Sequence, residues 1–150
     1  MQSLPQKLEA ACATLIDLPG VSVPVNRQGD TSTVPIQVFT GIDDEKKVLP
    51  SATVAVMSGQ EFPQDSGNFT LSVIVEIRSN ADETALSAHR QLCEDALSPL
   101  MQDDTADQLS QPDEAIGCMG ISNRASRERV EDRTWVTEFS FDAYCCGQAL

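Results

Sequence analysis

Histidine, aromatic side chains and basic residues are all scarce in this sequence. His89 is the only histidine, aromatic residues make up 5% of the chain, and 10 Lys and Arg face 23 Asp and Glu, giving a net charge of -13. Modules that bind nucleic acid need basic patches with aromatic side chains among them, and an acidic surface repels phosphate groups and anionic membranes. The composition therefore disfavours direct binding to nucleic acid or to a membrane surface.

Long apolar runs are also missing. No stretch approaches the roughly 20 apolar residues of a membrane span, and the N-terminus has no basic region followed by a long apolar core. The chain has 150 residues, of which 41% are hydrophobic and 22% are charged, which suits one globular domain with a single core. We therefore expect residues 1–150 to form one soluble domain that is made in the cytosol.

The five cysteines lack the spacing of a redox or zinc motif; they are Cys12, Cys93, Cys118, Cys145 and Cys146. No CxxC occurs, and an odd number cannot all pair, which indicates a reducing compartment. Cys12 and Cys93 fall on the apolar faces of two predicted helices, where a free thiol behaves as a small hydrophobic side chain. Cys145 and Cys146 would point to opposite faces of a strand, so no metal or redox role is expected for them.

The single histidine and the acidic clusters do not form a recognisable site. His89 and Cys93 stand four residues apart on one helical face, but two ligands do not make a structural zinc site. We interpret His89 as a core or interface residue whose ring nitrogen meets a backbone carbonyl. Asp103, Asp104 and Asp107 lack the alternating ligands and the glycine of a calcium loop. The residues thus predict no catalytic, cofactor-binding or metal site, and the chain is not expected to be an enzyme.

Two amphipathic helices are predicted from their first residues and from apolar residues at helical spacing. Ser3 and Gln6 form a capping box that opens a helix over residues 3–18. Asn80 and Glu83 stand three apart, as an N-cap and its returning partner do, and open a second helix that ends near Pro99 or Met101. A further helical turn is expected over residues 103–110.

Two stretches alternate apolar with mostly polar residues, which predicts two half-buried strands. Between residues 69 and 78 the residues that share one face are Phe69, Leu71, Val73, Val75 and Ile77. Between residues 134 and 145 they are Trp135, Thr137, Phe139, Phe141, Ala143 and Cys145. These two strands are expected to supply most of the sheet side of the core.

Three weaker strands complete the predicted sheet. One covers residues 34–39, where Pro35 favours an edge position, and one covers residues 51–57, with both faces largely covered. The third covers residues 115–123, where two glycines indicate a close backbone approach or a bulge. Residues 21–33 are polar and are interrupted by proline and glycine, so a loop is expected there.

The order of these elements predicts an α+β fold. Helix, three strands, helix and two strands follow one another (α-β-β-β-α-β-β), without an internal repeat. Such a chain is expected to form a mixed, mostly antiparallel sheet of four to five strands with the two main helices packed on one face.

A basic segment stands out on this acidic chain. Before residue 124, 18 Asp and Glu face 6 Lys and Arg, whereas the segment from 124 to 133 carries a charge of +1. Its basic residues are Arg124, Arg127, Arg129 and Arg133. Because the segment lies between the last two strands, we expect it at the tip of an extended hairpin. Such a tip is either a solvated turn with local ion pairs or a surface that pairs with an acidic face of a neighbouring copy.

Three sequence segments stand at the starts of predicted elements. Residues 61–69 (EFPQDSGNF) lead through a P-x-x-x-G approach into an alternating strand, and residues 79–84 (SNADET) open a helix. Residues 133–137 (RTWVT) begin the closing strand, which ends in Tyr144-Cys145-Cys146. With the order of the elements, this arrangement resembles the tail terminator and tail-completion (head–tail joining) proteins of long-tailed bacteriophages, over roughly residues 50–146.

The resemblance implies a structural virion protein without a cofactor. Proteins of this family assemble as hexameric rings at the head-proximal end of the tail tube, end its polymerisation and join the tail to the head connector. The implied partners are other copies of this chain in a homohexamer, the tail tube protein and the head–tail connector or neck protein, and none is a membrane. Genomic DNA would pass through an acidic lumen without specific binding. The protein would be assembled in the host cytoplasm and belong to the tail or neck of the virion.

The four arginines are the residues to which we assign contacts under this hypothesis. Arg124, Arg127, Arg129 and Arg133 are expected at the interface between subunits or with the tube. Two other interpretations stay open. Another neck or head-completion protein of a phage shares the setting and the ring habit, and a small cytosolic ligand-binding or enzymatic α+β domain would use His89, Cys93 and nearby acids around a pocket.

Overall fold

Five of the strands form one mixed sheet. The computed structural model describes residues 3–17, 21–27, 29–41, 48–61, 67–111 and 116–146. Its elements are α1 Leu4–Ile16, β1 Ser22–Arg27, β2 Asp30–Pro35, β3 Gln37–Thr40, β4 Ser51–Glu61, β5 Asn68–Asn80, α2 Leu86–Leu97, the 3₁₀ helix η1 Ser98–Leu100, α3 Thr105–Ser110, β6 Cys118–Glu131 and β7 Thr134–Cys146. The main sheet has the order β3-β4-β5-β7-β6. Strand β3 pairs with β4 in parallel, and the other neighbours pair antiparallel. The predicted α+β fold class is confirmed.

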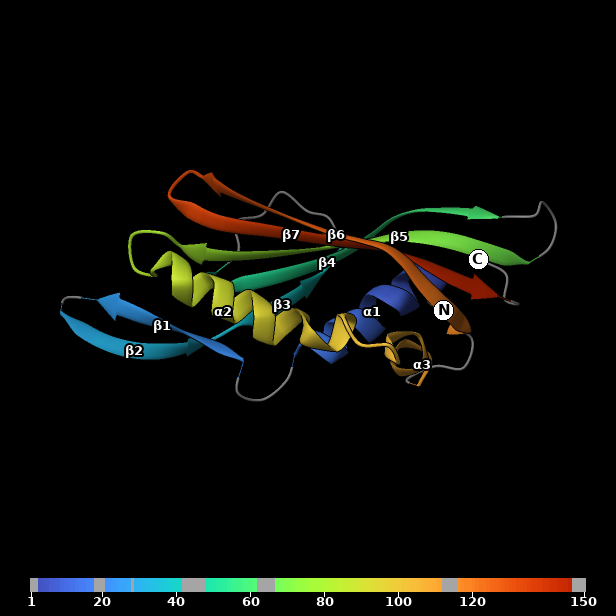
Figure 1. Cartoon of the computed structure of the whole chain (residues 1–150), viewed down its shortest axis with the longest axis horizontal. Helices are drawn as coiled ribbons and strands as arrows, with labels where there is room; N and C mark the ends of the chain where they lie inside the picture. The colour runs from blue at the N-terminus through green and yellow to red at the C-terminus, as the bar shows by residue number, and fades with distance from the viewer. Residues whose placement is uncertain are drawn as a thin grey trace.

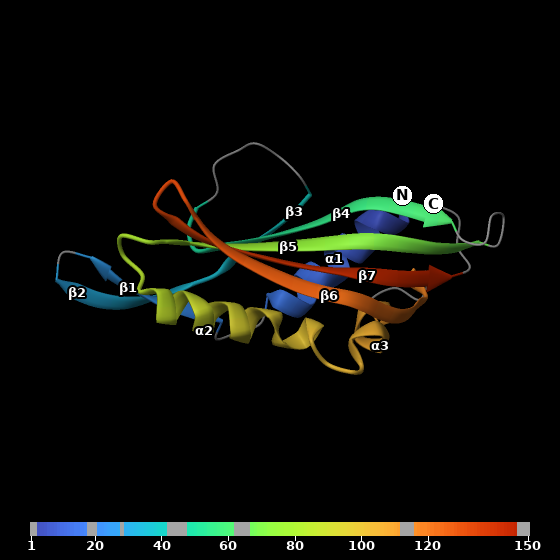
Figure 2. The same cartoon turned by 45° about the horizontal axis from the view of Figure 1, so that its top comes forward.

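The helices α1, α2 and α3 lie on one face of this sheet (Figures 1 and 2). Helix α1 contacts β3 and β4, α2 contacts β7, and α3 contacts β6. The two-stranded sheet β1–β2 lies beside α2 and adds to the layer that covers this face. The core lies between the layers, where burial of each large apolar side chain contributes about 1.5–3 kcal/mol. Its largest fully buried members include Leu8, Ile16, Leu71, Ile77, Leu92, Phe139 and Phe141.

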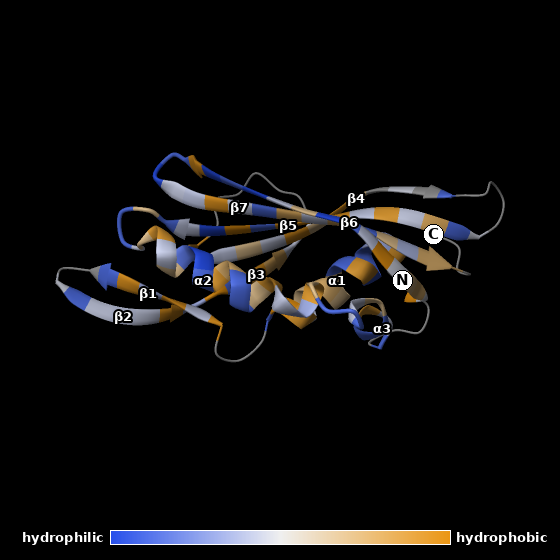
Figure 3. Cartoon of the chain, viewed as in Figure 1, coloured by the Kyte–Doolittle hydropathy of each residue, from blue (hydrophilic) through white to orange (hydrophobic). Residues whose placement is uncertain are grey.

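The two predicted alternating strands are confirmed as β5 and β7. In β5, buried side chains alternate with partly exposed ones along all 13 residues, and β7 shows the same alternation over most of its length. Figure 3 shows this as hydrophobic and hydrophilic bands along both strands. The two strands are hydrogen-bonded neighbours from the pair Asn68 and Cys146 to the pair Asn80 and Thr134. The sheet side of the core therefore lies where the sequence pattern placed it.

The start of α1 was predicted correctly, but the start of α2 was not. Ser3 caps α1, and its capping box with Gln6 is present. Asn80, in contrast, is the last residue of β5, and its Oδ1 accepts a hydrogen bond from the Asp82 backbone N–H at 2.8 Å. Helix α2 begins only at Leu86, without a side-chain cap. Pairing with β7 keeps Asn80 in the strand, so its side chain closes the turn that follows instead of capping the helix.

The polar stretch 21–33 is not a loop, and the strand expected at 34–39 is divided. Strands β1 and β2 form a hairpin, and Ile36 separates β2 from β3. Alternate valines of this stretch are buried in the core; they are Val21, Val23 and Val25. Proline is tolerated in β1 because each strand of a two-stranded sheet has one free edge. Pro24 and Gly29 favour a loop, but burial of the alternating valines outweighs that preference, so the prediction was wrong.

Strands β4 and β6 are longer than predicted. Strand β4 runs to Glu61 and pairs antiparallel with β5, with a bulge between Val56 and Ser58. Met57 at this bulge is exposed, so one face of β4 is less covered than predicted. Strand β6 runs to Glu131 and has the expected irregularity between Cys118 and Gly120. Residues 62–66, which belong to a segment that carries the family resemblance, lie outside the described residues.

Candidate subunit interface

The four arginines of the basic segment are spread along β6 and its turn. Arg124, Arg127 and Arg129 lie in β6, and only Arg133 lies in the two-residue turn to β7. Asp132 and Arg133 have φ angles of 48° and 58°, as the tight turns of two-residue hairpins require. The extended hairpin is thus confirmed, but the placement of all four arginines at its tip was wrong. Long pairing between β6 and β7 moves three of them away from the turn.

Arg124 joins β6 to the end of η1. Its Nε donates to the carbonyl of Leu100 at 3.0 Å, and its Nη2 donates to the carbonyl of Gln102 at 2.9 Å. It lies where the β6–β7 register shifts between Ser122 and Ala125. The Leu100 carbonyl lies at the end of η1, where backbone acceptors lack partners within the helix, so the guanidinium satisfies it. Arg124 therefore positions the edge strand against the helical layer.

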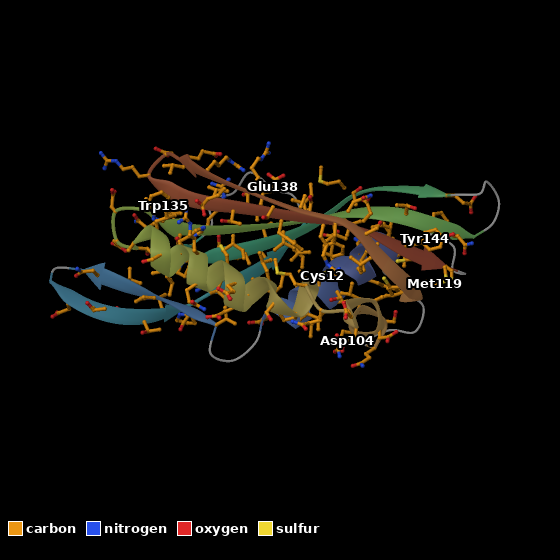
Figure 4. All side chains as sticks on the ribbon, in the orientation of Figure 1. Cys12, Asp104, Met119, Trp135, Glu138 and Tyr144 are labelled. Carbon is orange, nitrogen blue, oxygen red and sulfur yellow. The ribbon has the colours of Figure 1, made fainter. Side chains whose placement is uncertain are left out.

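Arg129 is the centre of a charge cluster on the face of the sheet away from the helices. Its guanidinium contacts Glu131 at 2.9 Å, Glu76 of β5 at 3.2 Å and Glu138 of β7 at 3.3 Å. Figure 4 labels Glu138 on β7, on that uncovered side. Arg78 bonds to Glu76 at 2.6 Å and approaches Glu131 at 3.5 Å. With Arg127, these residues make a charge-balanced cluster across β5, β7 and β6.

The cluster also neutralises the repulsion between two neighbouring carboxylates within the sheet. Glu76 and Glu138 are direct cross-strand partners of β5 and β7, and two carboxylates in such positions repel each other. Arg129 offsets this repulsion because its guanidinium contacts both carboxylates. Hydrogen bonds to carboxylates raise the pKa of the Arg129 guanidinium, with Glu131 as the largest cause. Arg129 therefore links three strands on the face of the sheet opposite to the described helices.

We predict that replacing Arg129 with alanine lowers the free energy of unfolding by about 1–2 kcal/mol, because the facing carboxylates lose their shared counter-ion. Replacing Arg127 with alanine is the matched control and is expected to cost less than about 0.5 kcal/mol, since its ion pair is exposed. Urea unfolding at low and high salt measures both effects. Salt screens repulsion between carboxylates, so the loss in the Arg129 variant should shrink at high salt. Equal losses for both variants, or no salt dependence, would contradict this role.

Arg127 and Arg133 present their charges to solvent. The Arg127 side chain is 71% exposed and touches Glu138 only at 3.5 Å. The Arg133 side chain is 82% exposed and lies 3.7 Å from Asp82. The Arg133 carbonyl accepts a hydrogen bond from the Ala81 backbone N–H at 2.9 Å, which fixes the turn against the end of β5. The hairpin thus presents two exposed cations, Arg127 and Arg133. Arg124 and Arg129 instead contact other elements of the same chain.

Glu128 faces the helical layer, opposite to its neighbours Arg127 and Arg129. Arg90 of α2 donates to both of its carboxylate oxygens, at 3.1 and 2.8 Å. The hydrogen bond from Arg90 lowers the pKa of Glu128. This bidentate pair ties α2 to β6. Arg90 and Glu128 are 38 residues apart, so the sequence alone does not identify them as partners.

His89 is fully buried beneath the sheet, as the predicted core position requires. Its Nδ1 lies 2.6 Å from Ser79 Oγ and its Nε2 lies 2.9 Å from Thr137 Oγ1. The expected partner was a backbone carbonyl, so that prediction was wrong; hydroxyl groups of β5 and β7 lie nearer to the ring. Cys93 Sγ lies 3.4 Å from Nε2, and burial raises the pKa of this thiol to about 11. Both ring nitrogens are occupied within the core.

The acidic residues near α3 remain at the surface. Asp103, Asp104 and Asp107 are exposed, and Asp104 accepts a hydrogen bond from the Gln108 side chain at 3.2 Å. Across the described ranges of the chain, no group of three or more His, Cys, Asp or Glu side chains has an arrangement that could hold a metal ion. Within those same ranges, no helix is both long and apolar enough to cross a membrane.

No family model and no curated protein matches the sequence of this chain.

Proposed function

We propose that this chain is a structural virion protein that forms a ring at the head-proximal end of a phage tail tube. In this role it ends tube polymerisation and joins the tail to the head connector. The proposal rests on the resemblance over residues 50–146 and on one structural observation, the exposed arginines of the β6–β7 hairpin on an otherwise acidic chain. It involves no catalytic residue and no cofactor.

The charge distribution supports a head-to-tail contact between copies. A ring requires two different surfaces that complement each other, because each subunit contacts one neighbour with one side and the next neighbour with another. The segment from 124 to 133 carries a charge of +1 on a chain with a net charge of -13. Under the proposal, Arg127 and Arg133 therefore pair with acidic side chains of a second copy. Such complementarity favours association and fixes its orientation.

The position of the hairpin also supports this contact. Strand β6 is the last strand of the main sheet, so one of its edges faces away from β7. Its residues from Ser122 to Glu128 are exposed. An edge strand with charged side chains resists unspecific pairing but can accept a partner of matching charge. Under the proposal, this edge belongs to the interface, and Arg124 and Arg129 contribute by positioning it.

The overall acidity suits a channel for DNA. A lumen with negative charge repels phosphate groups and lets the genome pass without binding. The tail tube protein and the connector or neck protein would contact the two rims of the ring. No membrane partner is part of the proposal.

Charge reversal at the hairpin tests the interface. We expect the R127E/R133E variant to form rings only at a protein concentration about ten times that of the wild type or higher. Each reversed contact loses attraction and gains repulsion. It should also leave isolated tail tubes uncapped. The R127K/R133K variant keeps the charges and is the matched control, so it should assemble and cap tubes as the wild type does. Normal ring assembly and capping by R127E/R133E would refute the proposed role of these arginines.

Binding to isolated parts of the virion distinguishes the main alternative. A terminator binds the end of a purified tail tube, whereas another neck or head-completion protein binds the portal or its adaptor and ignores tubes. Sedimentation of the protein with each of these particles separates the two outcomes. Binding to the portal alone would assign the chain to the neck.

A further inference from the structure

Two thiols face each other where β6 begins and β7 ends. Cys118 and Cys145 are direct partners in the β6–β7 register, and both are free and buried. Cys12 of α1 belongs to the same buried cluster. Figure 4 labels Cys12 on α1, together with Met119 and Tyr144, which follow Cys118 and precede Cys145 at this end of the molecule. The sheet thus brings together cysteines that lie far apart in the sequence.

The backbone hydrogen bonds show whether Cys118 and Cys145 are a hydrogen-bonded or a non-hydrogen-bonded pair of the antiparallel ladder. The Cys146 N–H donates to the Gly117 carbonyl at 3.0 Å, one step outside the cysteine pair. The Cys118 N–H donates to Ser110 Oγ at 2.9 Å instead of to β7. Cys118 and Cys145 therefore occupy a non-hydrogen-bonded site of the antiparallel ladder. Cα atoms at such sites lie about 4.5 Å apart, within the roughly 4.4–6.8 Å that a disulfide spans.

The two thiols differ in reactivity. Hydrogen bonding with Cys145 lowers the pKa of Cys118, and the same contact together with burial raises the pKa of Cys145. Burial also raises the pKa of Cys12. Cys118 retains 7% of its surface exposed, whereas Cys145 retains none. Since the thiolate is the form that reacts, Cys118 is the first of these three thiols to react with a small oxidant.

We propose that Cys118 and Cys145 form a reversible cross-strand disulfide when the protein meets a peroxide. The Cys118 thiolate attacks one oxygen of hydrogen peroxide, which gives a sulfenic acid and releases hydroxide. The Cys145 sulfur then attacks the Cys118 sulfur, and the sulfenic oxygen leaves as water with the Cys145 proton. The hydroxide takes the proton that Cys118 lost, so two thiols are oxidised and one peroxide is reduced to two waters. This proposal departs from the expectation that Cys145 has no redox role, and it does not depend on the proposed virion role.

The bond would fasten the open end of the hairpin. Its other end is closed by the turn at Asp132 and Arg133, so the disulfide would tie the start of the edge strand β6 to the end of its neighbour β7. Closing this segment reduces the freedom of the unfolded chain. We expect the oxidised protein to melt roughly 5–10 °C above the reduced form, and a reductant should reverse the increase.

Peptide mapping of the full chain after hydrogen peroxide treatment tests the pair. The expected product is a monomer lighter by two hydrogen atoms, in which a disulfide links the peptides that carry Cys118 and Cys145. The C146A variant is the matched control, because it removes the adjacent thiol on the opposite face of β7, and it should form the same bond. A bond from Cys118 to Cys146, or conversion of Cys118 to a sulfinic acid without any disulfide, would overturn the proposal.

A variant at the reactive thiol provides the second readout. C118A should keep its remaining thiols free under the same treatment and show no increase in melting temperature. Should this variant fail to fold, the peptide map of the wild type still decides, since it identifies the linked residues directly. An increase in melting temperature of oxidised C118A equal to that of the wild type would refute the role of the pair.

Discussion

Replacing His89 with leucine is expected to lower the free energy of unfolding by about 2–5 kcal/mol, because two buried hydroxyl groups lose their partner. Ser79 Oγ and Thr137 Oγ1 both contact the imidazole, one at each ring nitrogen, and all three residues lie in the core. Leucine fills much of the same volume, so the loss reports unsatisfied hydrogen bonds more than a cavity. Urea unfolding measures it. A loss below about 1 kcal/mol would contradict this account of the network.

The control removes the hydroxyl groups as well. Adding Ser79→Ala and Thr137→Val to the leucine variant should recover part of the lost stability, since replacing all partners of a buried network by apolar groups avoids orphaned polar atoms. No recovery in the triple variant would show that packing, and not hydrogen bonding, sets the cost of the leucine substitution.

His89 also gives the protein a pH signature. Burial lowers its pKa in the folded state below the ordinary value of about 6.5. The unfolded chain therefore binds the proton more readily, so the contribution of His89 is complete above about pH 6.5 and is lost progressively as the pH falls. Stability of the wild type should decline from pH 7 towards pH 5, and the leucine variant should decline less. Parallel pH profiles would contradict a buried neutral histidine.

Replacing Gly117 with alanine is expected to cost about 2–4 kcal/mol, because the residue combines a left-handed backbone with a close approach. Its φ is +53°, and a Cβ built on it would lie 2.7 Å from the backbone oxygen of Cys146. That oxygen belongs to β7, which cannot move away without disturbing its pairing with β5 and β6. The midpoint of urea unfolding measures the cost.

Two other glycines separate the causes. Gly29 has a φ of +84° with nothing within 4 Å of an added Cβ, and Gly120 has open space without a positive φ. Alanine at Gly29 should therefore cost only about 1 kcal/mol, and alanine at Gly120 should be nearly neutral. Equal costs at Gly117 and Gly29 would show that the contact with Cys146 contributes nothing.

Local sequence patterns predicted the parts of the fold whose determinants lie close together in the chain. The capping box of Ser3 and Gln6 involves residues three apart, and the faces of β5 and β7 follow from strict alternation. The glycines near residue 118 indicated an irregular strand, and Gly117 does approach Cys146 closely. In these elements local preference and tertiary packing favour the same structure, so the sequence alone was sufficient.

The failures occur where long-range pairing decides the structure. Asn80 has the sequence context of a helix cap, but its pairing with Thr134 of β7 extends β5 through it. Pro24 suggested a loop, but burial of Val23 and Val25 against the core stabilises a strand there. In both cases partners distant in the sequence outweigh the local preference. For Asn80, no window of neighbouring residues contains that information, whereas the alternating valines of β1 are a local signal for a strand.

At the candidate interface, too, a local pattern was predicted and the long-range pairing was not. Charge counting identified the basic segment, and the segment does lie on the last hairpin. The sequence could not distinguish Arg129, which is engaged with Glu76 and Glu138, from Arg127, which is largely exposed, because that distinction depends on the order of β5, β7 and β6. The alternation of residues puts Glu76 and Glu138 on the polar faces of their strands. It does not show that the two residues are cross-strand partners.

The mass of the protein in solution, with and without purified tail tubes, tests the proposed ring most directly. Light scattering combined with negative-stain imaging should show a particle of about six times 16.2 kDa, or six-fold caps on tube ends when the tubes are present. Assembly on tubes alone would still agree with the proposal, because some rings form only on their partner. A protein that remains a monomer and leaves tube ends bare would contradict it.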